Sequence, residues 1–482
     1  MKFLEKMRSI KKAEIALAKK QLPLEKLRKK AVKAGHSFRK ALGGKATESK
    51  QPFKKAPAKK GIALIAEFKK SSPSKGKINP NASISGFVRL YDKYADAVSM
   101  LTEQKFFSGK TDFTRTAKMF TSKPIMRKDF IIDAYQVYEA RYYRADAVLL
   151  IANMLPEKKL RELTALTESL GMDALVECDD ASSLRKALAS GSELIGINNR
   201  NLNTMEEDFS KTRRLAKIIP ASKRKKMILV SESSISTRKQ VESLKGVADA
   251  VLVGTSIMNA PVPEVKLKEL TGKTLIKFCG TTSKKDALGA VKLGADLIGL
   301  NFYKKSPRFV TAAGARKIAD AVRGKVLVAG VFVNMEKSGV KKIAKAIGLN
   351  VLQFSGNETP AYVKSFKSFG LPVIKAIHVR DAHSVSRAAK YDADFVMLDS
   401  FSEGLYGGTG KRIDFGLMGK NKKIKGKKVV FSGGLNAENV GRVIRQFSPL
   451  MVDVCSGIEA KPGRKSFSKM KSFISSVKGA GK

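Results

Sequence analysis

Residues 145–180 read ADAVLLIANMLPEKKLRELTALTESLGMDALVECDD, and they show a pattern that recurs along the chain. Apolar runs at 147–152 and 173–179 flank a longer segment of helical character. Because neither run alternates apolar with polar residues, each indicates a parallel strand that is buried on both faces. A strand, a helix and another strand in this order predict a βαβ unit.

After residue 60 the chain contains two sets of eight such apolar runs. Eight strand–helix units in about 200 residues is the size of a small (β/α)8 barrel. An open, doubly wound sheet is the alternative, and a count of eight strands in both halves argues against it. The predicted strands cover residues 62–69, 97–102, 124–130, 147–152, 173–179, 194–200, 227–233 and 250–256 in the first set, and 275–280, 297–303, 326–334, 351–356, 373–379, 395–400, 429–435 and 451–459 in the second.

We therefore predict an α/β protein with two tandem (β/α)8 barrels, also called TIM barrels, and a helical extension at the N-terminus. Pro261 and Pro263 resist regular structure and Gly272 supplies a turn, so we place the joint between the barrels there. The predicted ranges are 1–60 for the basic extension, 61–260 for the first barrel, 261–273 for a linker and 274–482 for the second barrel.

The N-terminal segment predicts two helices. Phe3, Met7 and Leu17 recur at roughly helical spacing, and Pro23 separates this amphipathic pattern from a second one. Residues 43–60 are predicted to form a mobile basic loop. Because no apolar run follows the first residues, we expect no secretory signal, and acidic residues on the first helix argue against a mitochondrial transit peptide.

The composition limits the possible partners. The 482 residues include 93 Lys or Arg and 43 Asp or Glu, which gives a formal net charge of +50. A hydrophobic content of 43% can build sizeable cores and excludes disorder for the chain as a whole. A basic surface could bind nucleic acid, but no aromatic-rich nucleic-acid module is present, so we do not expect such a partner. The same charge would steer phosphorylated substrates toward the protein.

Cysteine and histidine are scarce. Three cysteines, far apart and odd in number, exclude a disulfide framework and a cysteine-rich zinc module, and they fit a reducing compartment. Three histidines leave little material for a metal site, so we expect neither a metal nor another cofactor. No stretch approaches the apolar length of a membrane span. We therefore expect a cytoplasmic protein that does not contact membranes.

Polar side chains end most strands of the first set. In a (β/α)8 barrel, catalytic groups lie at the C-terminal ends of the strands. Acidic and basic groups gathered in one mouth shift each other's pKa values and become acids and bases near neutral pH. An ordinary ion pair explains any single one of them, but it explains the whole set poorly. These residues are Glu67, Lys69, Lys128, Glu177, Asn198, Arg200, Glu232 and Ser233.

The strands of the second set end in a different pair of candidate catalytic residues. Both sets also have small residues after their last two strands. Cys279 ends the first strand of the second set and Asp399 ends the sixth, so they come together only if the barrel closes. Because a lone cysteine is usually an inert hydrophobe, Cys178 and Cys455 are interpreted as structural. Small residues after the last two strands of both halves are typical of a phosphate site. They include Gly254, Thr255, Gly434, Ser456 and Gly457.

The motifs of the first half resemble those of indole-3-glycerol-phosphate synthase, and those of the second half are similar to phosphoribosylanthranilate isomerase. The first group comprises IAEFKKSSPSKG (65–76), MRKDFIIDAYQVYEARYYRADAVLLIA (126–152), ALVECDD (174–180), IGINNRNL (195–202), VSESSIS (230–236) and VGTSIM (253–258). The second comprises KFCGTTSKKDA (277–287), GADLIGLNFYKKSPRFV (294–310), AGVFVN (329–334), LDSFSEGLYGGTGKRIDF (398–415), FSGGLNAENV (431–440) and VDVCSGIEAKPGRK (452–465). Together they cover nearly the whole chain, so the resemblance implies a bifunctional enzyme of tryptophan biosynthesis.

The resemblance implies specific roles in the isomerase half. Cys279 would be the general base and Asp399 the general acid of an Amadori rearrangement that needs no cofactor. Arg308 would pair with the anthranilate carboxylate. Gly408, in the GLYGGTG stretch at 404–410, would belong to a mobile loop beside the acid and contact the substrate. The amides of Gly434 and of the Ser456-Gly457 pair would hold the phosphate.

It also implies roles in the synthase half, which would close the indole ring with loss of CO2 and water. Lys128 would be the general acid and Glu177 its acid/base partner, and Lys69 would contact the substrate carboxylate and share in proton transfer. Glu67 and Asn198 would orient and stabilise charge. The groups that line the site or hold phosphate would be Ser72, Ser74, Arg200, Glu232, Ser233, Gly254 and Thr255.

Two positions depart from the family patterns. Ser234 stands where the synthase family usually has glycine beside the phosphate, and Ser355 replaces the usual histidine of the isomerase family. Decay of one of the two halves, through Ser234 or Ser355, is therefore an alternative to full bifunctionality, although the proposed acids and bases are all present. The alternative to an enzyme is a basic protein that binds nucleic acid. We expect the chain to act on small phosphorylated substrates as a monomer.

Overall fold

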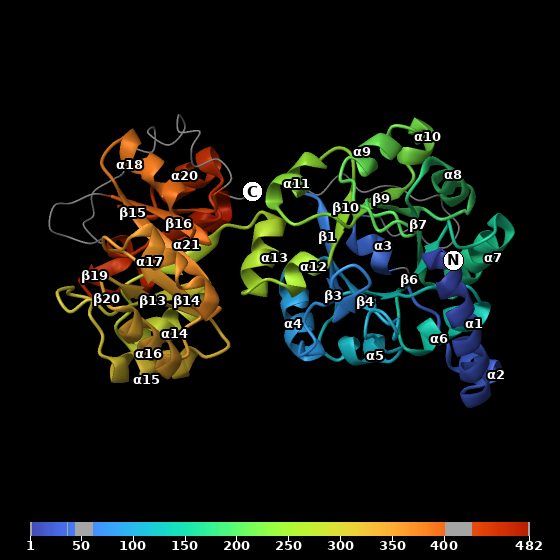
Figure 1. Cartoon of the computed structure of the whole chain (residues 1–482), viewed down its shortest axis with the longest axis horizontal. Coiled ribbons are helices and arrows are strands. Elements are labelled where there is room, and N and C mark those ends of the chain that lie inside the picture. The colour runs from blue at the N-terminus through green and yellow to red at the C-terminus, as the bar shows by residue number, and fades with distance from the viewer. Residues whose placement is uncertain (1, 36, 44–60, 401–426, 481–482) are drawn as a thin grey trace. The chain divides into compact units, whose positions relative to one another are not determined.

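The computed structural model describes residues 2–35, 37–43, 61–400 and 427–480 (Figure 1). The chain divides into two compact units, Met1–Thr271 and Gly272–Lys482. Each unit contains one closed barrel of eight parallel strands. The fold class predicted from the apolar runs, two tandem (β/α)8 barrels, is therefore confirmed.

The first barrel follows the chain around the ring and closes between its first and last strands, where Ala63 pairs with Ala250. Every strand was predicted as an apolar run at the corresponding place. The strands are β1 (Ala63–Phe68), β4 (Ala97–Leu101), β5 (Ile125–Lys128), β6 (Ala147–Ile151), β7 (Asp173–Cys178), β8 (Leu194–Asn198), β9 (Ile228–Glu232) and β10 (Ala250–Val253).

Alternate residues of each strand belong to two different apolar cores, which explains why the runs are continuous. In β6, Leu149 and Ile151 join the cluster inside the barrel, whereas Val148 and Leu150 join the cluster under the helices. This alternation also decides which polar residues enter the mouth. Along a strand, every second side chain faces the inside of the barrel, and the side chains between them face the helices.

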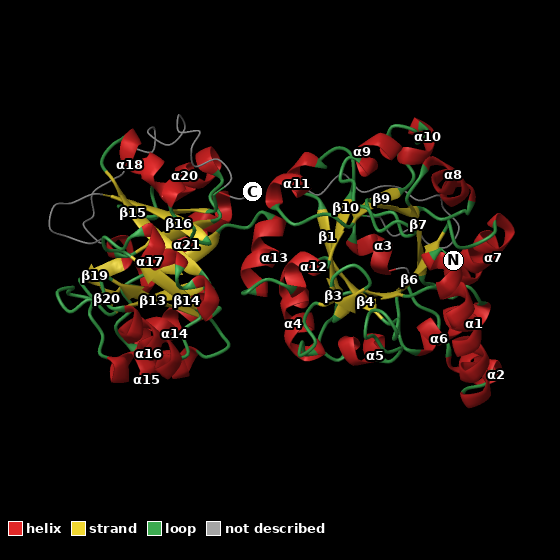
Figure 2. Cartoon of the chain, viewed as in Figure 1, coloured by secondary structure: helices red, strands yellow, loops and turns green. Residues whose placement is uncertain are grey.

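Helices surround the strands of this unit, as the red ribbons in Figure 2 show. They are α4 (Ile84–Tyr94), α5 (Phe113–Lys118), α6 (Ala134–Tyr142), α7 (Glu157–Ser169), α8 (Ala181–Ala189), α9 (Lys211–Ala216), α10 (Ala221–Arg224), α11 (Arg238–Ser243), α12 (Thr255–Met258) and α13 (Pro263–Thr271). A short hairpin, β2 (Ser71–Ser72) with β3 (Gly76–Lys77), follows the first strand.

One part of the predicted linker at 261–273 is helical. Helix α13 occupies Pro263–Thr271 and packs against α4 and α11 as the last helix of the first unit. Pro263 starts this helix, where a missing N–H loses no hydrogen bond and the fixed φ of proline suits the first turn. The prediction that this proline resists regular structure was therefore wrong.

The N-terminal extension forms the two predicted helices and a third, α1 (Phe3–Gln21), α2 (Leu24–Lys30) and α3 (Ser37–Ala41). Pro23 separates the first two. Leu4, Met7 and Phe38 are buried with the interior cluster of the barrel. The mobile loop predicted at 43–60 lies outside the described residues apart from Gly43.

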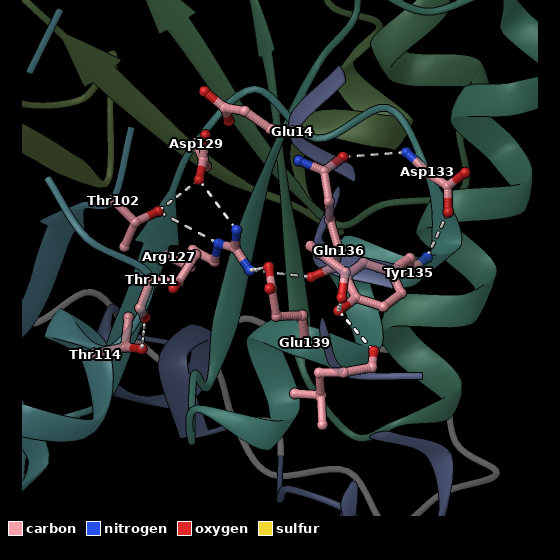
Figure 3. A network of polar contacts seen from close by, with 12 residues as sticks. Glu14, Thr102, Thr111, Thr114, Arg127, Asp129, Asp133, Tyr135, Gln136 and Glu139 are labelled. Carbon is pink, nitrogen blue, oxygen red and sulfur yellow. Dashed lines mark hydrogen bonds and ion pairs between the residues drawn. The ribbon is translucent and has the colours of Figure 1, made fainter. Parts of the chain in front are cut away.

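A buried charge network links α1 to the end of strand β5. Figure 3 shows the part of this network around Arg127, Asp129 and Glu139. Lys11 lies 2.7 Å from the Oδ1 atom of Asp129. The other oxygen of this carboxylate accepts hydrogen bonds from Thr102 and Arg127. The Nη1 atom of Arg127 lies 2.7 Å from Glu139. Although burial opposes it, the charges of Lys11 and Arg127 hold the pKa of Asp129 well below its usual value.

The second barrel closes between β11 and β18, where Leu275 pairs with Met451. The strands are β11 (Leu275–Phe278), β12 (Leu297–Asn301), β13 (Leu327–Phe332), β14 (Val351–Phe354), β15 (Val373–Val379), β16 (Phe395–Ser400), β17 (Val429–Phe431) and β18 (Met451–Val454). The described helices are α14 (Lys284–Leu293), α15 (Ala312–Val322), α16 (Lys337–Ile347), α17 (Pro360–Lys364), α18 (Ala382–Arg387), α20 (Val440–Phe447) and α21 (Phe467–Ala480). A hairpin of β19 (Glu459–Lys461) and β20 (Arg464–Lys465) follows the last strand.

Among the described helices of both units, none is both long enough and apolar enough to cross a bilayer.

Candidate active sites

A cavity of about 330 Å³ opens at the C-terminal ends of the first barrel's strands. Nearly all the site residues predicted from their place at strand ends line this cavity. They meet there because each of those that belongs to a strand faces the inside of the barrel. Those that line it are Glu67, Lys69, Ser72, Lys128, Glu177, Asn198, Arg200, Glu232, Ser233, Gly254 and Thr255. Ser74 is absent from this lining, but its hydroxyl accepts a hydrogen bond from Arg200.

Lys128 is the centre of the charged cluster in this cavity. Its Nζ atom lies 3.0 Å from Glu177 and 2.8 Å from Glu232. Burial alone would lower the pKa of Lys128, but the neighbouring carboxylates raise it well above its usual value, so the ammonium is retained at neutral pH. Burial and the charge of Glu177 raise the pKa of Glu232 to about 8 despite the attraction of Lys128.

The remaining polar groups orient this cluster. The side-chain amide of Asn198 donates to the Oε1 atom of Glu177, and Lys69 lies 2.7 Å from the Oε1 atom of Glu67. Gly254 leaves room for Glu67, since a Cβ atom there would lie 2.3 Å from the same Oε1 atom. Two ammonium groups are thus each held by carboxylates within one cavity.

Apolar side chains form the other part of the wall. Phe3 reaches the cavity from α1, Phe107 from the loop after β4, and Phe130 from the loop after β5. Leu149 and Leu202 complete an apolar surface suited to an aromatic ring. Sequence reasoning missed these residues because scattered aromatics resemble ordinary core residues until the fold brings them together.

Glu207 is a further lining residue that the sequence did not single out. Its carboxylate pairs with Arg200 and accepts a hydrogen bond of 2.8 Å from the hydroxyl of Ser234. Ser233 and Ser234 both have positive φ angles, 65° and 59°. The left-handed backbone at this edge of the mouth is therefore built from serines rather than glycines.

The second barrel places Cys279 at the end of β11, beside a buried ion pair. The Nζ atom of Lys277 lies 2.8 Å from Asp453 on β18. A hydrogen bond with the Cys455 thiol lowers the pKa of Cys279 to about 6 against the effect of burial, and the charges of Lys277 and Lys465 act in the same direction. This shift favours the thiolate form of Cys279 at neutral pH.

Asp399 lies on β16 and is buried. Because all strands of the closed barrel are parallel, their C-terminal ends share one rim, and Asp399 and Cys279 lie near it. Arg308 holds Glu459 with two nitrogens, Nε at 2.9 Å and Nη2 at 2.7 Å. The sequence predicts that Arg308 pairs with a carboxylate of the substrate. In the structure, two nitrogens of its guanidinium group bind the carboxylate of Glu459.

The loops after β17 and β18, where a phosphate site is predicted, contain tightly packed backbone. Gly434 has a φ of +64°. A Cβ atom at Gly457 would lie 2.0 Å from the carbonyl oxygen of Leu435, so only glycine fits. Ser456 begins a turn of 3-10 helix. Gly408 lies outside the described residues.

Two family models match the chain in tandem. Residues 4–270 match indole-3-glycerol phosphate synthase, and residues 276–476 match N-(5'-phosphoribosyl)anthranilate isomerase. The tryptophan biosynthesis protein TrpCF of Haemophilus influenzae is 34% identical over 97% of this chain and 95% of the relative. The corresponding protein of Vibrio cholerae is 34% identical over 86% of each chain.

The chain belongs to both families. Its first unit is an indole-3-glycerol phosphate synthase domain and its second a phosphoribosylanthranilate isomerase domain. The solved phosphoribosyl anthranilate isomerase of Thermotoga maritima is 37% identical and covers 43% of this chain and 99% of its own, with a TM-score of 0.40.

The two departures from the family patterns have local consequences. In the synthase barrel, Ser234 keeps the left-handed backbone and uses its hydroxyl on Glu207. In the isomerase barrel, the hydroxyl of Ser355 accepts from Gln353, and its carbonyl lies 3.0 Å from the Nε2 atom of His378. Both serines therefore have defined partners in the protein.

The cysteines outside the predicted catalytic set differ from each other. Cys178 is 2% exposed and donates to the carbonyl of Gly196. Cys455 is only partly buried and lies beside Cys279, a neighbour that its interpretation as a structural residue did not include. The contact was invisible in the sequence because it depends on how β11 and β18 pair. Within the described part of the chain, no group of three or more His, Cys, Asp or Glu is arranged to hold a metal ion.

Proposed function

We propose that the two barrels catalyse consecutive reactions. The isomerase barrel would convert N-(5-phosphoribosyl)anthranilate to 1-(2-carboxyphenylamino)-1-deoxyribulose 5-phosphate. The synthase barrel would convert that product to indole-3-glycerol phosphate, CO2 and water. The observation that carries the proposal is the presence, in a chain of both families, of a separate cluster of acids and bases at the rim of each barrel.

In the isomerase, we assign the general acid to Asp399 and the general base to Cys279. Asp399 protonates the ribose ring oxygen, and the ring opens to an iminium species. The thiolate of Cys279 then removes the proton from C2, and the resulting enolamine rearranges to the ketone. A thiolate whose pKa is lowered to about 6 is in the basic form required at neutral pH.

In the synthase, we assign the first proton donor to Lys128. Its ammonium group polarises and protonates the ketone oxygen during ring closure, and CO2 leaves afterwards. Loss of the hydroxyl as water completes the indole, with Glu177 as the acid/base partner. Lys69 pairs with the departing carboxylate and shares in proton transfer, while Glu67 and Asn198 orient the charged groups.

The binding roles follow from position. In the synthase, the aryl ring would lie on the surface of Phe107, Phe130 and Leu149, and the phosphate near the edge formed by Ser72, Ser74, Arg200, Ser233, Gly254 and Thr255. In the isomerase, Gly434, Ser456 and Gly457 would hold the phosphate. Arg308 offers the anthranilate carboxylate its Nη1 end, because Nε and Nη2 bind Glu459.

The test is product analysis of the purified chain supplied with phosphoribosylanthranilate, where indole-3-glycerol phosphate as end product requires both activities. Cys279→Ala should lower only the isomerase rate and Lys128→Ala only the synthase rate, each by about 100-fold or more. If Cys279→Ala abolished the synthase step and spared the isomerase, the assignment would be wrong. We also expect activity as a monomer in the cytoplasm, which size-exclusion chromatography and cell fractionation would check.

A further inference from the structure

Cys279 and Cys455 occupy opposite positions at the ends of two neighbouring strands. In the β11–β18 pair, Lys277 lies opposite Asp453 and Phe278 opposite Val454. The amide of Cys279 then donates to the carbonyl of Val454 at 2.9 Å, which continues the same register. The next residue of each strand is a cysteine.

Both cysteine side chains face the inside of the barrel. Phe278 and Val454 belong to the apolar cluster under the helices, and Lys277 pairs with Asp453 on the opposite face of the strands. Two positions further along each strand, the cysteines return to that interior face. The sulfur of Cys455 lies 3.9 Å from the Oε1 atom of Glu459 and 3.8 Å from the Nζ atom of Lys465, at the same end of the barrel as Cys279. Each thiol shifts the pKa of the other, as expected of neighbouring groups.

The backbone separation suits a covalent link. Adjacent strands lie about 4.8 Å apart, and disulfides join Cα atoms about 4.4–6.8 Å apart. The sulfur of Cys455 also reaches toward the end of β11, since a Cβ atom at Gly280 would lie 2.9 Å from it.

The surroundings make Cys279 reactive. Lys277 and Lys465 lie beside the pair, and the Nζ atom of Lys465 is 3.8 Å from the Cys455 sulfur. Asp453 and Glu459 balance the two lysines, so the surroundings are mixed in charge. A partly exposed thiol with lysines beside it can react with peroxides as its thiolate. Cys178 provides the contrast, because it is buried and burial raises the pKa of its thiol.

We propose that Cys279 and Cys455 form a peroxide-reactive thiol pair that closes to a disulfide and reversibly stops the isomerase while sparing the synthase. Closure of the disulfide stands on the strand register and on the place of both cysteines at the ends of paired strands. The loss of isomerase activity rests on the proposed function of Cys279 as the base.

The reaction consumes one hydrogen peroxide and has two steps. The Cys279 thiolate attacks one peroxide oxygen, the O–O bond breaks, and the leaving hydroxide takes a proton from solvent to become water. The sulfur is now a sulfenic acid. The Cys455 thiol attacks that sulfur, the S–O bond breaks, and the leaving hydroxide takes the thiol proton as a second water. The two thiols lose two electrons in total and the peroxide gains them.

The test exposes the full chain to graded hydrogen peroxide and follows both activities, the intact mass and the disulfide-linked peptides. We expect a linked peptide containing residues 279 and 455, a mass lower by two hydrogen atoms, and an isomerase rate lower by about 100-fold with the synthase rate retained. Dithiothreitol should restore the isomerase. Each variant is compared with its own untreated activity.

Cys178→Ser is the matched control and should behave as the parent chain. In Cys455→Ser the link cannot form, so peroxide should drive Cys279 to higher oxidation states that dithiothreitol does not reverse. Absence of the 279–455 link in the parent chain would overturn the inference. A link that left the isomerase active would overturn the inhibitory effect, and Cys279→Ala assayed without peroxide would show separately whether the proposed base is also wrong.

Discussion

Glu232 lies 2.8 Å from the ammonium group of Lys128, and burial with the nearby charge of Glu177 nevertheless raises its pKa to about 8. Three ionisable groups therefore titrate together in a single cavity, and burial with the charge of Glu177 favours the protonated form of Glu232. Loss of that proton adds a negative charge where the phosphate and carboxylate of an anionic substrate must enter.

We predict that kcat/KM of the synthase falls as the pH rises through about 8, because Glu232 then ionises. Glu232→Gln cannot ionise, so its pH profile should lack this limb. The measurement is synthase kcat/KM between pH 6 and pH 10 for both proteins. If the glutamine variant still lost kcat/KM near pH 8, the titration would belong to a group other than Glu232.

The pH profile of the isomerase should change in the opposite direction. Its kcat/KM should rise with pH through about 6, because Cys279 must be ionised to accept a proton. Lys465→Met removes one of the cations that lower the pKa of Cys279 and should move this limb to higher pH. Lys461→Met, an exposed change in the same hairpin, should leave the limb in place. An unmoved limb in the Lys465 variant would show that this charge does not tune the thiol.

The strands could be predicted because buried parallel strands carry apolar residues on both faces. The 147–152 run became β6, with alternate residues in two cores. Helix α13 is not recognisable from the sequence, because a proline usually predicts a break, although the first turn of a helix tolerates it. Local pattern thus predicts elements well, but it cannot tell a proline that starts a helix from one that ends it.

The same limit applies to the candidate sites. Lys128 and Glu177 were predicted from their place at strand ends, which topology alone brings together. The contacts of Cys455 with Cys279 and of Arg308 with Glu459 depend on strand register and loop path. Neither is encoded in residue spacing, so both were missed.

Gly254 offers a steric test of the synthase site. Gly254→Ala would place a methyl group 2.3 Å from the Glu67 carboxylate, displacing the partner of Lys69. We expect the synthase rate to fall by about 10- to 100-fold while the isomerase rate is retained. Gly61→Ala is the control, since its methyl group meets no atom within 4 Å. Steady-state assays of both reactions measure the effect, and a fully active Gly254 variant would contradict it.

Ser234 holds a left-handed backbone that favours glycine. We predict that Ser234→Gly raises the free energy of unfolding of the first unit by about 1 kcal/mol, because the strain of an L-residue there is about 1–2 kcal/mol. Ser234→Ala keeps the strain and loses the hydrogen bond to Glu207, so it should not stabilise. Urea unfolding followed by circular dichroism compares the three proteins. A stability gain in the alanine variant alone would refute the strain argument.

Lys11 tests whether the N-terminal helix is part of the synthase unit's stability. Lys11→Met removes a buried partner of Asp129, and breaking a buried ion pair costs about 3 kcal/mol. Lys12→Met changes an exposed neighbour and should have little effect. Because the folded-state pKa of Asp129 is depressed, its contribution is present at neutral pH and is lost as the pH falls below about 4. The stability difference between Lys11→Met and the parent, measured by urea unfolding at several pH values, should therefore shrink in acid. A difference that stayed constant with pH would show that lost packing of the lysine stem, rather than its charge on Asp129, destabilises the variant.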